Sequence, residues 1–245
     1  MNNVVSNGLF KMRKSIFLTI FLATSTVCTP VYSQVGELRN MFSMGFNGGL
    51  STSSIQFNPT IKQQLNPGIT GGLTLRYNSE KYFWIICAAQ VECNLSQRGW
   101  NELIEDGSEN EYSRTINYVE VPFMAHLGFG REMRGIQGFL NLGPQIGFYL
   151  NDSETYGGTT PWDINNRPNG VTEQYGKTIE NKLDYGITGG LGFELRTEIG
   201  AFGIEGRYYF GLSDIFNNSK VDYFGRSANT VISLKAHYLF TLWNR

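Results

Sequence analysis

Two histidines, His126 and His237, are the chain's entire histidine content, so any histidine acid–base chemistry must use one of them. Strand-like alternation places both on one face together with charged residues from several segments. That inward set comprises Arg76, Glu92, Glu120, His126, Asp184, Glu194, Arg196, Glu205, Arg207, Lys235 and His237. Because buried charges must be paired, we expect these residues to form an ion-pair and hydrogen-bond network. A binding or catalytic site within the same set remains the alternative.

The motifs of common enzyme classes are missing from the sequence. It has no Gly-x-Ser-x-Gly elbow, no Ser-x-x-Lys and no His-Glu-x-x-His. The carboxylates Asp152, Glu154 and Asp163 lack the regular spacing of a calcium loop, and two separated histidines make no metal cluster. We therefore predict no enzymatic activity, no cofactor and no metal. A lipid-modifying enzyme stays open as an alternative, which would require a nucleophile or acid–base group near the membrane surface.

The inward set needs a scaffold, and its residues lie in segments of alternating polarity. From Phe202 to Leu212 one face is apolar, and the other carries Glu205, Arg207 and glycines. Repetition of such segments is typical of a transmembrane β-barrel. We predict an all-β fold, a closed antiparallel up-and-down transmembrane β-barrel of about eight strands. The expected strands cover approximately residues 42–51, 68–78, 82–96, 114–129, 135–150, 182–197, 201–213 and 227–243.

The connections between these segments predict an orientation. Short turns are expected at Asn78–Lys81, near Arg131 and near Glu198, and they alternate with long connections. Since such barrels have short periplasmic turns and longer outer loops, both termini should be periplasmic. Pro122 falls on the inward face of its strand, where a missing N–H predicts a bulge or local break in the ladder. A soluble β-sandwich is the alternative fold.

The N-terminus has the features of an export signal. Basic residues lie between Lys11 and Lys14, an apolar stretch follows, and a small-residue site ends at Ser33. We predict a signal peptide at 1–33, with Met12 as a second possible start, and an outer-membrane barrel domain at 34–245. Removal of residues 1–33 takes away three basic groups and no acidic ones, so the formal charge falls from −1 to −4. This charge does not suggest a nucleic-acid partner.

Cysteines offer little chemistry. Cys87 and Cys93 lie six residues apart in one expected strand, which separates them by about 20 Å. They are too far apart to pair within that strand. Both fall on its apolar face, so we interpret them as small lipid-facing residues.

Several segments resemble the PorT-like outer-membrane β-barrel family of Gram-negative bacteria. The segment from Asn117 to Phe123, Asn-Tyr-Val-Glu-Val-Pro-Phe, looks like that family's Tyr-Leu-Glu-Ile-Pro strand. Leu142-Gly143-Pro144, the segment 185–190 and the segment 207–215 are similar to family patterns in the same order. The resemblance implies an integral outer-membrane barrel. The member that names the family is linked to secretion through type IX machinery, but membership alone does not transfer that role.

We predict a non-enzymatic outer-membrane barrel that anchors or presents outer loops to partners. Its expected contacts are outer-membrane lipid and, in an alternative role, proteins of an envelope or secretion complex. The longest irregular stretch is expected from Asn151 to Asn181, and long loops on rigid scaffolds commonly carry recognition. Its candidate recognition residues are Tyr156, Trp162, Arg167 and Tyr175.

Overall fold

The computed structural model describes residues 37–105, 107, 109–131, 134–158, 167 and 170–244. The predicted signal peptide lies outside these residues. The described part of the chain contains nine strands, which hydrogen-bond into one sheet. Their bounds are β1 Glu37–Asn58, β2 Gln63–Gln64, β3 Asn66–Tyr82, β4 Ile85–Glu102, β5 Glu111–Gly130, β6 Gly135–Gly157, β7 Leu183–Thr197, β8 Gly200–Asp214 and β9 Arg226–Asn244.

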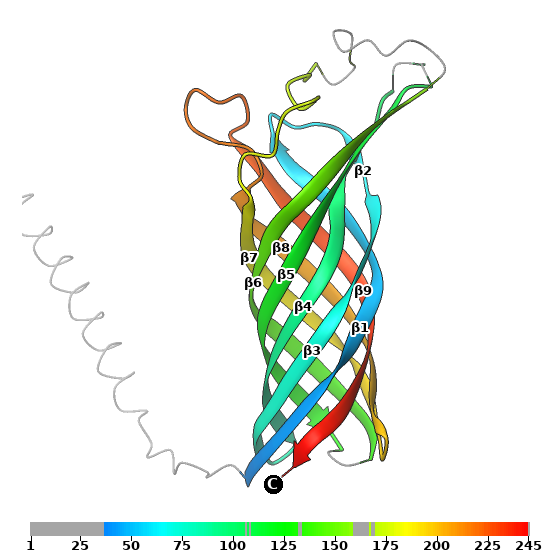
Figure 1. Ribbon diagram of the computed structural model, residues 1–245, viewed down its shortest axis with the longest axis vertical. Helices are drawn as coiled ribbons and strands as arrows, with labels where there is room; N and C mark the ends of the chain where they lie inside the picture. The colour runs from blue at the N-terminus through cyan, green and yellow to red at the C-terminus, as the bar shows by residue number, and fades with distance from the viewer. Residues whose placement is uncertain are drawn as a thin grey trace, which may run out of the picture. The chain divides into compact units, whose positions relative to one another are not determined.

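All strands except β2 form a closed antiparallel ring of eight. Within the ring, β1 pairs with β3, each later strand pairs with the next, and β1 pairs with β9 along most of its length. In Figure 1, β1 in blue lies beside β9 in red, and the strands are tilted around the barrel. Closure pairs the sheet edges that would otherwise present free N–H and C=O groups. The predicted fold class is confirmed, and the β-sandwich alternative is wrong.

One predicted turn is in the wrong place. The chain reverses at Phe83–Trp84, and 78–81 remain in β3. Phe83 has φ of 51°, the positive value that such a tight reversal requires. Both aromatic side chains of this turn are largely exposed. The other two short connections, at residues 131–134 and 198–199, lie where the sequence predicts them.

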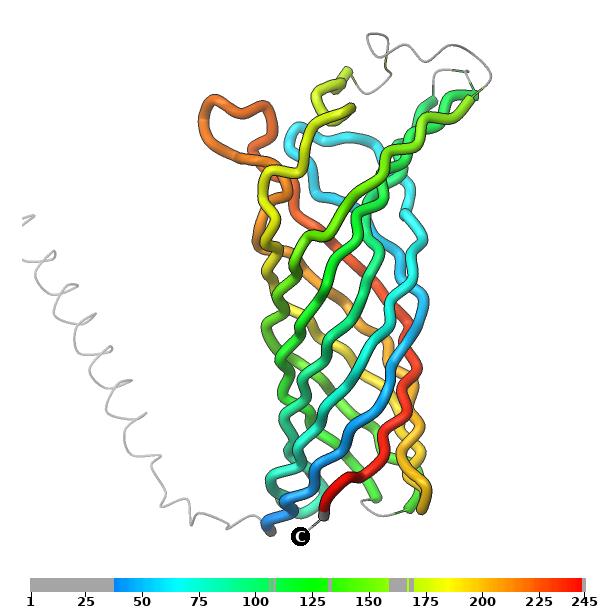
Figure 2. Tube along the Cα trace, in the orientation of Figure 1, coloured from blue at the N-terminus to red at the C-terminus, as the bar shows by residue number. Residues whose placement is uncertain are grey.

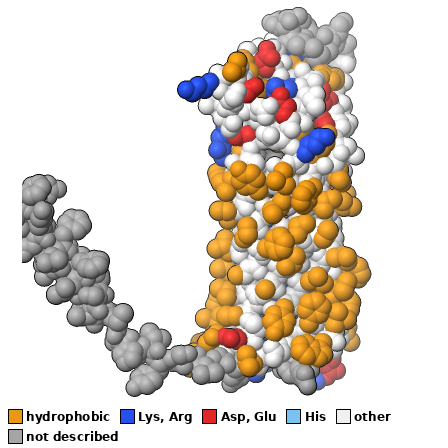
Figure 3. Space-filling model, turned by 60° about the vertical axis from the view of Figure 1, so that its left-hand side comes forward, with side chains coloured by type: hydrophobic (Ala, Val, Ile, Leu, Met, Phe, Trp, Pro, Cys, Tyr) orange, Lys and Arg blue, Asp and Glu red, His pale blue; other side chains and the backbone are white. Residues whose placement is uncertain are grey.

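Outward residues divide the barrel wall into two tiers. On β5 the outward side chains are apolar from Phe129 to Val119 and then polar at Asn117, Thr115 and Ser113. The other strands that continue past this level make the same change, for example from Leu50 to Thr52 on β1. Figure 3 shows the resulting apolar band, with charged and polar side chains beyond it. We call the polar-walled part the loop-end tier, formed by residues 51–58, 97–102, 111–117, 151–157 and 226–231.

The loop-end tier makes several strands longer than predicted. The β5–β6 hairpin extends furthest, as the green tube in Figure 2 shows. Residues 151–157 therefore belong to β6, and the expectation that the irregular stretch begins at Asn151 is wrong. The register shifts where Asn117 pairs with Asn151 but Tyr118 pairs with Tyr149, so Leu150 is the extra residue of a bulge. This bulge reverses the inward parity of β6, because Tyr149 is inward before it and Asp152 after it.

Pro122 interrupts the ladder without a bulge. The β4–β5 pairing passes from Val91 opposite Phe123 to Asn94 opposite Glu120, with no change of register. The local break predicted at this inward proline is therefore present on the β4 side. Cys87 and Cys93 are unpaired and lie on the outer face of β4, as predicted. The described residues contain no helix that is long and apolar enough to cross a membrane.

Candidate functional sites: the filled lumen and the loop-end cap

The interior of the apolar band contains charged residues in three layers. The layer nearest the termini centres on Glu194 of β7, whose side chain is inaccessible to solvent. Its carboxylate accepts bonds from Arg76 Nη1 at 2.6 Å and Arg196 Nε at 2.9 Å, and His237 Nε2 lies 3.0 Å away. Two arginines and one histidine therefore surround this single carboxylate.

The middle layer is electrically balanced. Glu92 accepts bonds from Arg207 at 2.7 and 2.8 Å and from Lys235 at 2.9 Å. Arg207 also donates to both oxygens of Glu205. The Glu205 carboxylate packs over Gly190 so closely that a Cβ at that position would overlap it. Glycine within this strand therefore makes room for a charged side chain.

The third layer lies nearest the loop-end tier and centres on Arg98. Its guanidinium donates to Glu120 at 2.8 Å and also bonds Asp184, and it lies over the Tyr209 ring at 4.3 Å. The Tyr209 hydroxyl donates to Asp184 at 2.8 Å. Two carboxylates, Glu120 and Asp184, therefore pair with this one arginine.

All eleven residues of the predicted inward set are buried. Ten of them lie in these three layers, whereas His126 instead contacts Asn141 at 2.8 Å and the Phe139 ring at 5.1 Å. The prediction missed Arg98, because the expected strand ended at Ser96 although the alternation continues to Glu102. It also missed the amides of Gln90 and Asn94, which donate to Glu92. Their positions in the alternation, on the inward face of the strand, could have identified them.

Side chains leave little open space at mid-lumen. The hollow between Arg98, Arg207 and Lys235 has a volume of about 20 Å³. That space is sufficient for about one water molecule. Eight strands give a barrel that side chains can fill, and here ion pairs span it from wall to wall. The geometry therefore favours a sealed interior over an aqueous pore.

The loop-end tier reverses this pattern, because its wall is polar outside and apolar inside. Twelve buried side chains form its core, which we call the loop-end cap: Ile55, Phe57, Ile61, Trp100, Tyr112, Ile116, Tyr118, Val171, Ile179, Ile215, Phe216 and Phe224. Trp100 is fully buried and meets Phe57 edge-on at 5.2 Å between ring centroids. Burial of apolar surface stabilises the folded state by about 25 cal/mol for each Å² removed from water. The cap resembles the core of a soluble β-barrel.

Residues 170–181 cross this end of the barrel and are fastened to its interior through Glu102. Gln174 Nε2 and the Tyr175 hydroxyl donate to the same Glu102 oxygen at 3.2 and 2.6 Å. Burial and the bond to Glu102 raise the pKa of Tyr175, so its hydroxyl stays protonated and able to donate. A second connecting segment, 215–225, contributes Phe216 and Phe224, which stack at 5.4 Å.

The family model of the outer membrane protein beta-barrel domain matches residues 32–217. The chain belongs to this family of outer-membrane β-barrels. It is therefore an integral outer-membrane protein, and the apolar band is its lipid-facing surface. This match confirms the outer-membrane barrel that the sequence resemblance implied. The narrower PorT-like relationship stays a prediction.

Solved structures that are similar to this chain include three bacterial outer-membrane proteins. OprG from Pseudomonas aeruginosa has a TM-score of 0.46 and 14% identity over 84% of this chain and 97% of its own. Neisserial surface protein A has a TM-score of 0.44 and 9% identity over 81% and 96%. Ail, the attachment invasion locus protein of Yersinia pestis, has a TM-score of 0.38 and 15% identity over 83% and 99%. The comparison with curated protein sequences finds no match.

The recognition residues predicted for this outer-membrane barrel lie partly inside the cap. Tyr175 packs edge-on against Tyr112 at 4.8 Å, and Arg167 is 7% exposed. Tyr156 is 43% exposed and donates to Glu154 at 2.6 Å. Trp162 lies outside the described residues. The positions of Tyr175 and Arg167 suit an anchoring role, and recognition by the four residues stays a prediction.

Proposed function

We propose that this protein is a sealed, non-enzymatic outer-membrane anchor that holds a folded cap at the cell surface for partners to bind. The reversal of side-chain polarity above the apolar band carries the proposal. Crossing the membrane alone does not require strands that continue past the lipid and enclose an apolar core. The cap gives the connecting segments a fixed platform, and binding surfaces are commonly built on loops held by a rigid scaffold.

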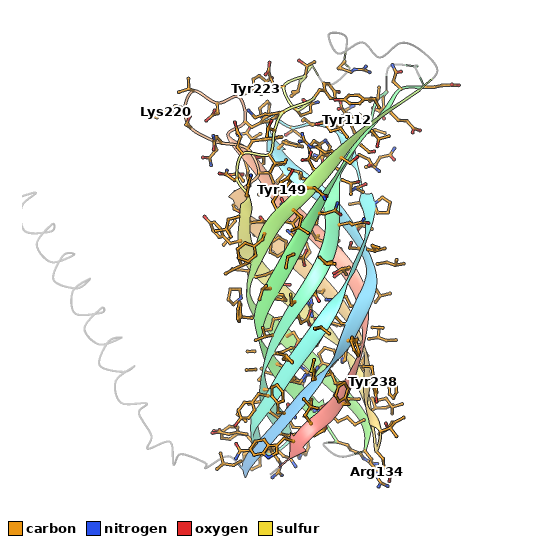
Figure 4. The ribbon with its side chains drawn as sticks, in the orientation of Figure 1. Tyr112, Arg134, Tyr149, Lys220, Tyr223 and Tyr238 are labelled. Atoms are coloured by element: carbon orange, nitrogen blue, oxygen red, sulfur yellow. The ribbon has the colours of Figure 1, made fainter. Side chains whose placement is uncertain are left out.

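The outward surface of that platform supports a recognition role. Val221, at the tip of segment 215–225, is 95% exposed, and Tyr223 is 47% exposed. Figure 4 shows Lys220 and Tyr223 projecting from the end of the barrel that also holds Tyr112. Phe224 lies buried in the cap directly after these residues. The buried Phe224 side chain holds the exposed apolar tip in place. Binding of a partner to that tip therefore costs little conformational entropy.

An enzymatic role has weaker support. Lipid-modifying chemistry at the outer rim needs an acid–base group there, whereas His126 and His237 are both buried inside the barrel. His237 belongs to the layer around Glu194, at the end opposite the cap. A part in secretion or envelope assembly depends on the PorT-like resemblance, and it would place the working surface on the periplasmic turns.

The orientation in this proposal puts both termini in the periplasm and the cap outside the cell, with residues 1–33 removed as a signal peptide. Single cysteines at Val221 and at Ile199, which is 72% exposed in a turn at the other end, test it in a Cys87→Ala/Cys93→Ala background. A membrane-impermeant maleimide should label position 221 in intact cells, and position 199 only after the outer membrane is permeabilised. The reverse pattern contradicts the orientation. N-terminal sequencing of the mature protein should begin at Gln34.

Partner binding can be tested from the same positions. A photocrosslinker at Val221 should capture a surface or extracellular partner, and one at Ile199 should serve as the matched control. Capture from position 199 alone, with periplasmic proteins in the product, favours the secretion or assembly role over surface presentation. A barrel without a cross-linked product at either position contradicts presentation.

A further inference from the structure

The outer face of the loop-end tier carries a continuous block of uncharged residues on β4, β5 and β6. Three rows of paired residues form this block, and each row takes one residue from each strand. Neighbouring side chains within such a row are about 5 Å apart, and successive rows lie about 7 Å apart. We call the block the polar grid; its first row is Gln97, Asn117 and Asn151, its second Gly99, Thr115 and Ser153, and its third Asn101, Ser113 and Thr155.

The polar grid offers hydrogen-bonding groups to a ligand. In its first row the Asn117 amide donates to Asn151 Oδ1 at 2.6 Å. In its third row the buried Oδ1 atom of Asn101 has no donor among the described residues. Each serine or threonine hydroxyl can donate one hydrogen bond and accept two. The grid hydroxyls that make no hydrogen bond to another described residue are those of Ser113, Thr115, Ser153 and Thr155.

The nine residues of the polar grid carry no charge, although charged side chains occur elsewhere at this end of the barrel. Lys177, Glu180 and Lys182 lie in the segment before β7, and Lys220 and Asp222 lie in the segment before β9. A hollow of about 970 Å³ borders the third row, and its described lining contains three glutamates and no Lys or Arg. Proteins that bind anionic lipid surfaces place Lys and Arg there. The grid therefore suits a neutral ligand rich in hydroxyl groups rather than a phosphate.

The polar grid lies at the level of the lipid head groups. Its first row directly follows Leu95 and Val119, whose outward side chains belong to the apolar band. From Asn117 to Ser113 the strand extends by about 13 Å, which gives a height of about 10 Å at the tilt usual for barrel strands. The head-group layer on each side of a bilayer is about 5–8 Å thick. The grid therefore spans this layer.

We propose that the polar grid binds the sugar head group of a neutral glycolipid whose acyl chains lie against the apolar band. The hydroxyls of the second and third rows exchange hydrogen bonds with the sugar hydroxyls, and Asn101 Oδ1 accepts one more. Continuity with the lipid-facing band selects a membrane lipid, because a free saccharide has no acyl chains to hold it at this level. The site is distinct from the partner-binding tip at Val221, and it rests on the proposed function only for the leaflet that supplies the lipid, which is the outer one.

Amide NMR of the intact mature protein in phosphatidylcholine nanodiscs tests the site. The probes are the neutral glycolipid digalactosyl diacylglycerol, phosphatidic acid and free digalactose. The glycolipid should cause saturable shifts of the amides at 97–101, 113–117 and 151–155, and the other two probes should leave these amides unchanged. No shift with the glycolipid, an equal shift with phosphatidic acid or an equal shift with free digalactose overturns the proposal. Both leaflets of the nanodisc contain the glycolipid, so the result does not depend on the orientation in cells or on a protein partner.

A triple variant tests the grid hydroxyls. Thr115→Val/Ser153→Ala/Thr155→Val removes three of them and should raise the glycolipid concentration at half-saturation by at least about fivefold. Valine suits a strand as well as threonine does, so the barrel should stay folded. Heat-dependent gel mobility verifies folding. Unchanged affinity in the folded triple variant overturns the assignment.

The matched control is Thr52→Val/Ser54→Ala on β1. It removes two outward hydroxyls just above the apolar band, where Pro67 and Ile232 lie on either side of Thr52 and interrupt the polar wall. This variant should change the half-saturating concentration by less than about twofold. A loss as large as that of the triple variant would mean that the grid is not the binding surface.

Discussion

Glu92 is the lumen residue whose neutralisation should destabilise the barrel most. Its carboxylate, 2% exposed, accepts bonds from two cations at 2.7–2.9 Å and from the amides of Gln90 and Asn94 at 2.7 and 2.9 Å. Glu92→Gln preserves the shape but leaves Arg207 and Lys235 facing Glu205 alone. Removing one partner of a buried ion pair costs about 3–5 kcal/mol. We therefore expect the free energy of unfolding to fall by about 3 kcal/mol or more.

A compensating substitution tests whether charge balance is the cause. In Glu92→Gln/Lys235→Met the remaining pair, Arg207 with Glu205, is neutral again. The double variant should recover about 1–3 kcal/mol relative to Glu92→Gln alone. Lys62→Met removes an exposed pair with Glu105 and should change stability by less than about 0.5 kcal/mol.

The assay is urea unfolding of protein folded into phospholipid vesicles, followed by tryptophan fluorescence and by heat-dependent gel mobility. A loss below about 1 kcal/mol in Glu92→Gln would mean that water or neighbouring amides replace the ion pairs at mid-lumen. If the stability loss of Glu92→Gln/Lys235→Met equals the sum of the losses of the two single variants, charge balance is not the cause.

Three further predictions concern the outer wall and the cap. Ile204→Arg, on the lipid face and 61% exposed, should cost about 2–4 kcal/mol if it lies at the bilayer midplane, measured by the same unfolding assay. Cys87 and Cys93 should remain free thiols in protein isolated from membranes, and a mass corresponding to a disulfide between them contradicts their place on one strand. Trp100→Ala should destabilise the cap by about 3–5 kcal/mol and accelerate proteolysis within 170–181, while the membrane part stays heat-modifiable. Equal protease resistance would show that the cap core does not hold that segment.

The alternation of polar and apolar residues along each strand was sufficient to predict the barrel and eleven buried residues of its interior. Residues such as Glu205 and Arg207 alternate with Ile204 and Tyr208, and burial follows that alternation. Residues that face lipid are apolar, so every strand repeats the same pattern of apolar outward and polar inward residues. That repetition identifies the fold class. Which inward charges pair with which could not be predicted, because tilt and register bring residues such as Arg76 and Glu194 together from strands far apart in sequence.

The loop-end tier escaped prediction for a different reason. Beyond the lipid the alternation continues with the opposite polarity, with Trp100 inward and Gln97 outward. A prediction that requires an apolar outer face therefore ends these strands too early. The bulge at Leu150 then changes the parity of β6 and makes residues 151–157 look irregular. Asp152 and Glu154, considered as calcium ligands from the sequence, instead bond Arg114. That pairing depends on the bulge, which the sequence pattern did not predict.

Accessibility along the outer face of β4 tests the two-tier barrel most directly. Single spin labels at Val91, within the apolar band, and at Asn101, in the loop-end tier, are introduced into a Cys87→Ala/Cys93→Ala background and reconstituted in vesicles. Relaxation by oxygen, which partitions into lipid, should dominate at position 91, and relaxation by a water-soluble nickel chelate at position 101. Chelate access at both positions would mean that the barrel does not sit in lipid at the apolar band. Oxygen dominance at both would place the loop-end tier inside the membrane and contradict a cap held outside it.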